Sequence, residues 1–272
     1  MLVVKYKLFR EFAMRPFAVF LTGAAFISLA CGIADAQEVE SEKPPAKNSR
    51  YTINLKDHDP NGIGKFYMGR EIASVMGYQA AKWLERPERE EEERLTKLAL
   101  ALEIKPGMVV ADIGAGSGRI SAMISPLVGP GGKVLAVDIQ DEMLSLIRLK
   151  AKQQKLENIE TVLSTEKSPK LDPESVDLAF MVDVYHEFSY PYEMTLELSK
   201  ALKPGGRLVF VEYRKEDPKV RRMIKVVHTM TEAQVKKEAE QEEFGLKWKK
   251  TLKVLPVQHI IVFEKQAERE TP

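Results

Sequence analysis

The sequence predicts an α/β protein with a largely parallel sheet covered by helices on both faces. From residue 106 onward, short runs rich in Val, Ile and Leu alternate with helix-type apolar patterns, as expected for strands that are buried on both sides. The chain has 272 residues, of which 44% are hydrophobic and 30% charged. This composition excludes a disordered or low-complexity chain.

The expected elements follow in order from this alternation of patterns. Five short apolar runs predict the strands of the sheet, and two adjacent runs joined across Pro256 predict a closing pair of strands. The expected strands span residues 108–113, 133–139, 159–163, 176–182, 207–213, 247–255 and 259–264. Helices are expected around 120–127, from 141, at 192–202 and at 231–243.

Ahead of the sheet, residues 51–85 predict a helical N-terminal extension or lid. Ile72, Val75, Met76 and Tyr78 are spaced like one face of a helix. The segment either packs on the edge of the sheet or covers a ligand, in which case Tyr67 or Arg70 would reach the substrate. A charged helix is expected from residue 88 to about 102, with its glutamate-rich start solvated and near the positive end of the helix dipole.

The N-terminus predicts a secretory signal peptide over residues 1–36. A basic start precedes an apolar run from Phe17 to Ala34, and Ala34 and Ala36 are small residues placed for cleavage before Gln37. Residues 37–50 then form a disordered linker, and Met14 is an alternative start. The expected location is periplasmic or secreted, with no stable membrane span after cleavage. The alternative is an uncleaved signal that anchors the chain.

The charge balance and the cysteine and histidine content exclude several classes of partner and site. Lys and Arg number 41 against 40 Asp and Glu, a formal net charge of +1, so we expect no nucleic-acid partner. Cys31 is the only cysteine, which excludes an intrachain disulfide. Four scattered histidines show no metal-ligand spacing, so no metal site is expected.

The most informative segment is a glycine loop between an expected strand and an expected helix. Asp112 precedes three alternating glycines, and the stretch consists of Asp112, Ile113, Gly114, Ala115, Gly116, Ser117 and Gly118. Ligands of open α/β sheets bind at the carboxyl ends of strands, where this loop lies. Asp138 ends the next expected strand and is placed to accept the hydroxyls of a ribose.

Charge decides between two nucleoside cofactors. A dinucleotide loop has the spacing G-x-G-x-x-G and binds a diphosphate, whereas this loop is G-x-G-x-G with Arg119 following. A carboxylate at Asp112 opposes a diphosphate but suits the cationic, phosphate-free S-adenosylmethionine. Alternatively, Asp112 only orders the loop.

At these residues the chain resembles the class I S-adenosylmethionine-dependent methyltransferases, over about residues 86–265. The resemblance implies a Rossmann-like fold with a mostly parallel seven-stranded sheet and an antiparallel terminal hairpin, followed by a tail at 266–272. It also implies that the glycine loop wraps the methionine part, with Asp138 at the ribose and Ile139 beside the adenine. The family often has an Asp after the third strand, where this chain has Thr165 and Glu166 as possible substitutes.

The resemblance places the acceptor after the fourth strand. Asp183 is expected to contact the cofactor. His186 titrates nearest neutrality and is the first candidate for a general base, ahead of Tyr185 and Glu187. Alternatively, these side chains only shape the loop, and transfer proceeds by proximity.

The expected function is therefore methyl transfer from S-adenosylmethionine to a small-molecule acceptor. Two alternatives remain: a non-catalytic cofactor-binding module of the same fold, and a nucleotide-dependent oxidoreductase, which the glycine spacing disfavours. The sequence indicates neither the acceptor nor the oligomeric state.

Overall fold

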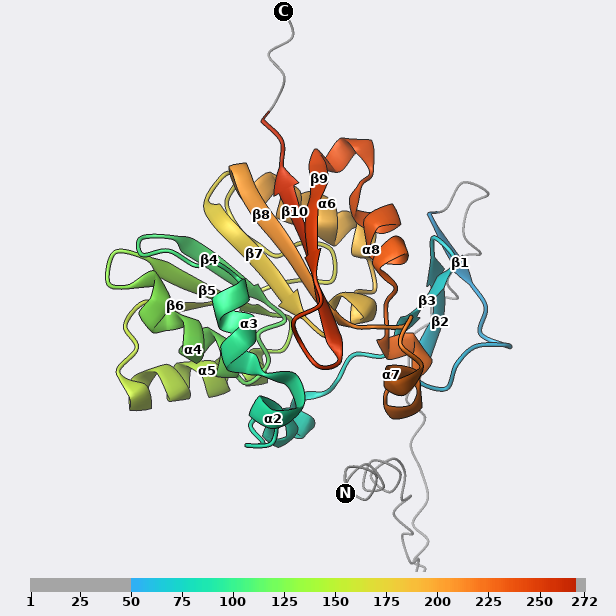
Figure 1. Cartoon of the computed structure of the whole chain (residues 1–272), viewed down its shortest axis with the longest axis horizontal. Coiled ribbons are helices and arrows are strands. Elements are labelled where there is room, and N and C mark those ends of the chain that lie inside the picture. The colour runs from blue at the N-terminus through green and yellow to red at the C-terminus, as the bar shows by residue number, and fades with distance from the viewer. Residues whose placement is uncertain (1–49, 268–272) are drawn as a thin grey trace, which may run out of the picture. The chain divides into compact units, whose positions relative to one another are not determined.

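The computed structural model describes residues 50–267, so the predicted signal peptide and all but the last residue of the predicted linker lie outside the described residues. Seven strands form the central sheet in the order β6-β5-β4-β7-β8-β10-β9 (Figure 1). Their bounds are β4 Val109–Ile113, β5 Lys133–Asp138, β6 Ile159–Leu163, β7 Val176–Val182, β8 Leu202–Tyr213, β9 Leu246–Leu252 and β10 Gln258–Lys265.

The sheet is parallel from β6 to β8, and β10 pairs antiparallel with both β8 and β9. The predicted mixed sheet with its closing hairpin is confirmed. Strand order reverses at β4, which lies between β5 and β7. Such a switch point leaves a crevice at the carboxyl ends of the strands, because the connections leave on opposite sides.

Two layers of helices cover the sheet because its buried strands alternate their side chains between the faces. Val110 packs with helices α3 and α4, whereas its neighbour Ala111 packs with α6 and α8. Helix α5 packs beside α4, through Leu144 and Ile147 against Ala136. The helix bounds are α3 Leu95–Ala101, α4 Arg119–Val128, α5 Asp141–Gln154, α6 Pro191–Ala201 and α8 Glu232–Ala239.

The prediction of a helical N-terminal extension is wrong for residues 51–73. Residues 51–73 form a separate antiparallel sheet of β1 Tyr51–Ile53, β2 Gly62–Tyr67 and β3 Arg70–Ala73. Tyr67 pairs with Arg70 across the two residues Met68 and Gly69, which both have positive φ, 48° and 98°. A two-residue loop with both φ positive is typical of a hairpin, and this turn overrides the helix-like spacing that includes Ile72.

Short helices connect this small sheet to the large one. The connection contains η2 Tyr78–Ala80, α1 Ala81–Leu84 and α2 Arg89–Glu93. The single helix expected from residue 88 to 102 is broken at Arg94, whose φ of 57° is left-handed and separates α2 from α3. The remaining helices are η3 Tyr185–Glu187, α7 Pro218–Met223, η4 Val226–His228 and η5 Glu242–Phe244.

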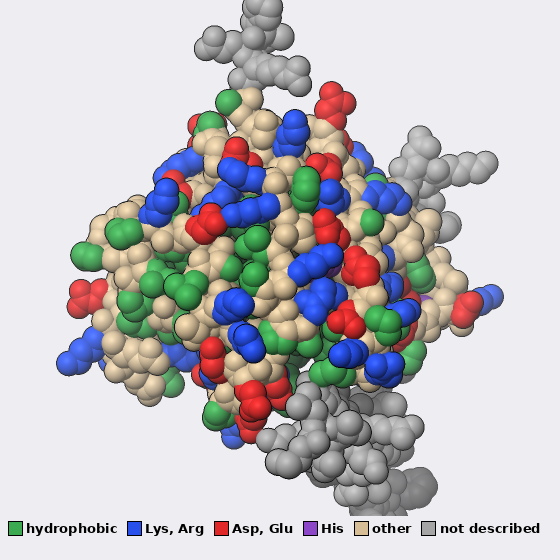
Figure 2. Space-filling view, in the orientation of Figure 1, with side chains coloured by type: hydrophobic (Ala, Val, Ile, Leu, Met, Phe, Trp, Pro, Cys, Tyr) green, Lys and Arg blue, Asp and Glu red, His purple; other side chains and the backbone are tan. Residues whose placement is uncertain are grey.

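Charged side chains of both signs are interspersed on the face shown in Figure 2. This mixture agrees with the nearly equal numbers of basic and acidic residues. Within residues 50–267, no helix has the length and apolar character needed to cross a bilayer.

Helix α3 offers a matched test of the core. Leu98 is 1% exposed and Leu100 is 70% exposed. We expect Leu98→Ala to lower the free energy of unfolding by about 2–5 kcal/mol, because it leaves a cavity. Leu100→Ala should change it by less than about 0.5 kcal/mol. Urea denaturation measures both, and equal losses would contradict the described orientation of the helix.

Candidate active site

The glycine loop after β4 adopts a backbone that other residues avoid. Gly114, Gly116 and Gly118 have φ of 67°, 55° and 72°. A Cβ on Gly114 would lie 2.5 Å from Val184 Cγ1, and one on Gly118 would lie 2.8 Å from Ile147 Cγ1. Both left-handed φ and close packing therefore require glycine. The Gly114 and Ala115 N–H groups donate to the Val137 carbonyl at 2.8 and 3.0 Å, which fixes the loop beside β5.

Asp138 ends β5 and joins the loop to the next turn. Its Oδ2 accepts a hydrogen bond from the Gly116 N–H and its Oδ1 accepts one from the Gln140 N–H, both at 2.9 Å. Burial raises the pKa of Asp138, although these two donors oppose the shift. Ile139 follows with 41% of its surface exposed. The structure thus brings Asp138 to the loop, as the sequence predicts.

Asp112 lies beneath the loop. Its side chain is buried, and Oδ2 accepts a hydrogen bond of 2.6 Å from the Ser121 hydroxyl of α4. Burial raises its pKa from 3.8 to about 7. This geometry favours the alternative in which Asp112 orders the loop by linking β4 to α4.

Asp183 directly follows β7 and has an unsatisfied buried oxygen. Its φ is 54°. Oδ2 accepts a hydrogen bond of 3.0 Å from Gln258 Nε2, whereas Oδ1 is buried with no hydrogen-bond partner. Burial, with the charges of Glu93 and Glu212, raises its pKa well above the usual range. A buried carboxylate oxygen of this kind needs a donor to offset its desolvation.

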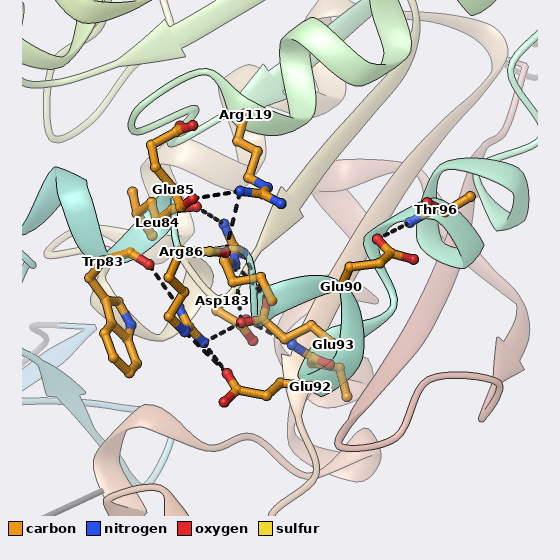
Figure 3. A network of polar contacts seen from close by, with 12 residues as sticks. Trp83, Leu84, Glu85, Arg86, Glu90, Glu92, Glu93, Thr96, Arg119 and Asp183 are labelled. Atoms are coloured by element: carbon orange, nitrogen blue, oxygen red, sulfur yellow. Dashed lines mark hydrogen bonds and ion pairs between the residues drawn. The ribbon is translucent and has the colours of Figure 1, made fainter. Parts of the chain in front are cut away.

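The connecting segment contacts the glycine loop and the start of α4, and Figure 3 shows Leu84 and Glu85 beside Arg119. A Cβ on Gly116 would lie 2.7 Å from Leu84 Cδ1, so Leu84 packs directly against the glycine backbone. Arg119 Nη1 donates to the Glu85 carbonyl at 2.8 Å, and the Ser117 hydroxyl donates to the Glu85 carboxylate. Gln140 Nε2 donates to the Met76 carbonyl at 3.0 Å. The cover is therefore bonded to both sides of the loop.

The glutamate-rich segment is solvated only in part: Glu90, Glu91 and Arg94 are exposed as its composition predicts, whereas two of its side chains are buried. Arg89 and Glu93 are 6% and 3% exposed and form a two-pronged pair with contacts of 2.8–3.1 Å. Arg86 donates to Glu93 at 2.9 Å and to Glu92 at 2.7 Å. In the sequence, the i, i+4 spacing of Arg89 and Glu93 indicates that the two side chains can pair on a helix. The spacing does not show whether such a pair is buried or exposed.

Thr165 and Glu166 are exposed in the turn after β6. Thr165 Oγ1 accepts a hydrogen bond of 3.1 Å from the Ser168 N–H and closes this turn. The Ser164 N–H donates to the Asp138 carbonyl at 2.9 Å, so the turn adjoins the end of β5. A contact from these residues to an adenine stays a prediction.

The acceptor side is organised by a residue that the sequence analysis missed. Glu212, fully buried in β8, accepts a hydrogen bond of 3.0 Å from the Tyr185 N–H through Oε1. Its Oε2 lies 2.6 Å from His186 Nδ1, within hydrogen-bonding distance. Burial lowers the pKa of His186 to about 4 and raises that of Glu212 to about 8. The sequence feature that could have identified Glu212 is its position as a single acidic residue within the apolar run Val209–Tyr213.

Glu187 lies between this pair and the cover. Its Oε2 accepts a hydrogen bond of 3.3 Å from the Met76 N–H. Burial raises its pKa to about 7, and the charge of Asp138 adds to the shift. The Met76 contact thus joins Glu187 to the connecting segment, and its place beside an acceptor stays a prediction.

Tyr185, Tyr67 and Arg70 are buried rather than presented to a substrate. Tyr185 is fully buried, with its ring 4.8 Å from that of Phe210, which does not favour its use as a base. The Tyr67 hydroxyl accepts a hydrogen bond from Gln241. Arg70 pairs with Glu238 at 2.7 Å and donates to the His186 carbonyl at 3.3 Å. The lid hypothesis expected Tyr67 or Arg70 to reach a substrate, but both side chains point into the protein and are bonded there.

The structure also brings together histidines that are far apart in the sequence. The rings of His186 and His228 meet edge to face with centroids 5.1 Å apart. His228 Nδ1 lies 3.9 Å from Glu187 Oε1. The expectation that the histidines are scattered is therefore wrong for this pair, because η4 folds back against η3.

Residues 104–259 match the methyltransferase domain family. The chain belongs to this family. A solved S-adenosylmethionine-dependent methyltransferase from Aquifex aeolicus is 27% identical, with a TM-score of 0.64, over 70% of this chain and 100% of that chain. The fold, the class I methyltransferase domain and S-adenosylmethionine as its methyl donor are thus confirmed.

Other relatives are similar over shorter stretches or in fold alone. The ubiquinone/menaquinone biosynthesis C-methyltransferase UbiE of Shewanella oneidensis is 28% identical over 121 residues, 44% of this chain and 48% of the relative. The chain spans about half the length of the curated relatives it matches. The [4+2]-cyclase SpnF, 14% identical, has a TM-score of 0.55 over 64% of this chain and 80% of its own, which shows the fold.

The residues of this methyltransferase domain fit S-adenosylmethionine. The unpartnered Asp183 Oδ1 is an acceptor for a cationic group, and the neighbouring Val184 packs against Gly114 of the loop. Asp138 presents a carboxylate on the other side of the same loop. Carboxylates around glycine backbone suit a cation without phosphate.

Asp112 gives the methyltransferase domain a testable pH dependence. The folded state binds this proton more tightly than the unfolded state, since the pKa rises from 3.8 to about 7. Its stabilising contribution is therefore complete below pH 3.8 and is lost as the pH rises through about 7. Asp112→Asn should remove this decline, whereas the exposed Asp172→Asn should not. Urea denaturation across this pH range measures it, and parallel curves for Asp112→Asn and wild type would contradict the burial.

Proposed function

We propose that this protein transfers a methyl group from S-adenosylmethionine to a small organic acceptor. The unpartnered buried oxygen of Asp183 beside the glycine loop carries the proposal, because it needs a hydrogen-bond donor, which the ammonium of S-adenosylmethionine would supply. The family and the similarity to the Aquifex enzyme support the same donor.

Each residue of the site has a part in binding. Asp138 would accept the ribose hydroxyls, and its two backbone donors hold the carboxylate in place for this task. Asp183 would accept from the ammonium of the methionine part. When bound, S-adenosylmethionine supplies an activated methyl group on its sulfonium. The chain contributes alignment and excludes water, and alignment alone accounts for a large part of the rate acceleration in such reactions.

His186 is the candidate for removing a proton from an acceptor that must lose one. Burial lowers its pKa to about 4, which corrects the expectation that it titrates near neutrality: the imidazole is neutral at pH 7 but is a weaker base than the sequence predicts. Glu212 and Arg70 act as positioning residues, since one bonds the ring and the other the backbone carbonyl of His186. This role follows from the ring's place after β7, at the carboxyl end of the sheet.

The acceptor is proposed to be a small molecule of the quinone or phenol type. The relative named for ubiquinone and menaquinone biosynthesis supports this class. Balanced charge on the chain disfavours polyanionic acceptors.

Asp138 provides the test of cofactor binding. We expect Asp138→Asn to weaken S-adenosylmethionine at least about tenfold, the equivalent of roughly 1.4 kcal/mol, because it replaces an acceptor oxygen with a donor. Asp141→Asn, an exposed acid three residues further on, should leave the affinity unchanged. Isothermal titration measures the affinity of both variants for S-adenosylmethionine. Incubation of the protein with labelled S-adenosylmethionine and quinone-type acceptors measures methyl transfer. Binding of NAD in place of S-adenosylmethionine would overturn the proposal, and binding without any transfer would favour a non-catalytic module.

We also propose that the chain is exported by residues 1–36. The basic start, the apolar run and the small residues before Gln37 support this. Fractionation with N-terminal sequencing tests it: a chain beginning at Gln37 outside the cytosol is expected. A chain that retains Phe17 in the membrane fraction would support the anchored alternative, and one found intact in the cytosol would contradict both.

A further inference from the structure

Two imidazoles and a carboxylate meet at the acceptor side of the cofactor loop. Ligand atoms of His186, Glu187 and His228 all lie within 4.8 Å of one another. Glu187 Oε1 lies 4.0 Å from His186 Nε2 and 3.9 Å from His228 Nδ1. Both distances exceed a hydrogen bond, so the carboxylate of Glu187 is not hydrogen-bonded to either imidazole.

We propose that His186, Glu187 and His228 bind one divalent transition-metal ion, of which Zn²⁺ is the representative. Two histidines and one carboxylate form a common ligand set of catalytic zinc sites, which keep a further position open. Bonds of about 2.0–2.2 Å to such an ion require donors about 3–3.5 Å apart. Small side-chain adjustments, without a change of rotamer, would bring the ligand atoms from their present separations to this distance.

Glu212 gives this set the outer partner that metal-bound histidines usually have. A ligating imidazole normally donates its second N–H to a carboxylate, which fixes the ring and its tautomer. His186 Nδ1 lies 2.6 Å from Glu212 Oε2, and Nε2 is the atom that lies 4.0 Å from Glu187 Oε1. Metal at Nε2 requires the Nδ1 proton to be donated to Glu212, which the observed bond allows.

The surrounding charges permit a cation here. Glu187, Glu212 and the nearby Asp59 are acidic. Arg70 and Lys225 are the cations close to the two histidines, and both are engaged elsewhere. Arg70 pairs with Glu238, and the Lys225 ammonium contacts the Asn61 side chain. An ion would also offset the desolvation of the Glu187 carboxylate.

A metal at this place has a chemical consequence, which rests on the proposed methyl transfer. Its open position would take an oxygen atom of the acceptor, which selects acceptors with a phenolic, enolic or quinone oxygen next to the reacting atom. The lone pair of His186 Nε2 would then be committed to the ion. The ion and the general-base role of His186 therefore exclude each other.

The test is metal binding by the full-length protein after chelation and dialysis. Titration with Co²⁺ should give visible absorption bands of a nitrogen- and oxygen-ligated ion at one equivalent per chain, which Zn²⁺ then displaces. Glu187→Gln and His228→Ala should each abolish this saturable signal. Glu212→Gln should weaken binding about 10–100-fold, as expected for an outer partner. His58→Ala removes an imidazole outside the set and should leave binding unchanged.

Two outcomes would overturn the proposal. One is an absence of stoichiometric Co²⁺ or Zn²⁺ uptake by the wild type, and the other is uptake that Glu187→Gln and His228→Ala leave intact. Thermal melting shows whether each variant is folded. A second His228 variant, His228→Gln, keeps the size of the side chain and should also lose the ion. Titration of the same metal-free samples with S-adenosylhomocysteine reports the cofactor site separately, so failure of the metal site and failure of the proposed methyl transfer give different results.

Discussion

Buried polar pairs hold the carboxyl edge of the central sheet in its observed form. His186 with Glu212, Arg70 with Glu238, Arg89 with Glu93 and Asp112 with Ser121 each remove two polar groups from water and satisfy them against each other. Breaking one partner of such a pair leaves an uncompensated polar group and is costly. The loops that form the site, including η3, therefore have little freedom to rearrange independently.

These pairs also connect parts of the chain that are distant in sequence. Arg70 belongs to the small N-terminal sheet, yet it bonds Glu238 of α8 and the carbonyl of His186. Leu84 and Glu85 contact the glycine loop, and Met76 contacts both Gln140 and Glu187. The residues before the methyltransferase domain thus complete the site as well as cover it.

Burial sets the protonation states at the site. His186 and His228 both have pKa values lowered to about 4, chiefly by desolvation, so both are neutral near pH 7. Neutral imidazoles can accept a proton or bind a metal, whereas imidazolium can do neither. The fold itself does not choose between these roles, because one fold supports different chemistries through the side chains at its site. SpnF, a cyclase with this fold, is an example.

Local pattern was sufficient for the sheet and for the cofactor loop. The strands β4 to β7 and the loop from Gly114 to Gly118 depend on contiguous apolar runs and on glycine spacing, which are visible in a short window of sequence. Asp138 follows from its place at the end of a strand. The methyltransferase resemblance rests on these same local features.

Tertiary structure alone decided which side chains from separate elements meet around the site. The Met68-Gly69 turn converts an apparent helix face into a hairpin, and a left-handed Arg94 divides the charged helix. The pairing of Arg89 with Glu93 in the interior, and the meeting of His186, Glu187 and His228, depend on burial and on long-range packing. Sequence pattern records which side chains share a helix or strand, whereas desolvation and proximity arise only when separate elements pack together.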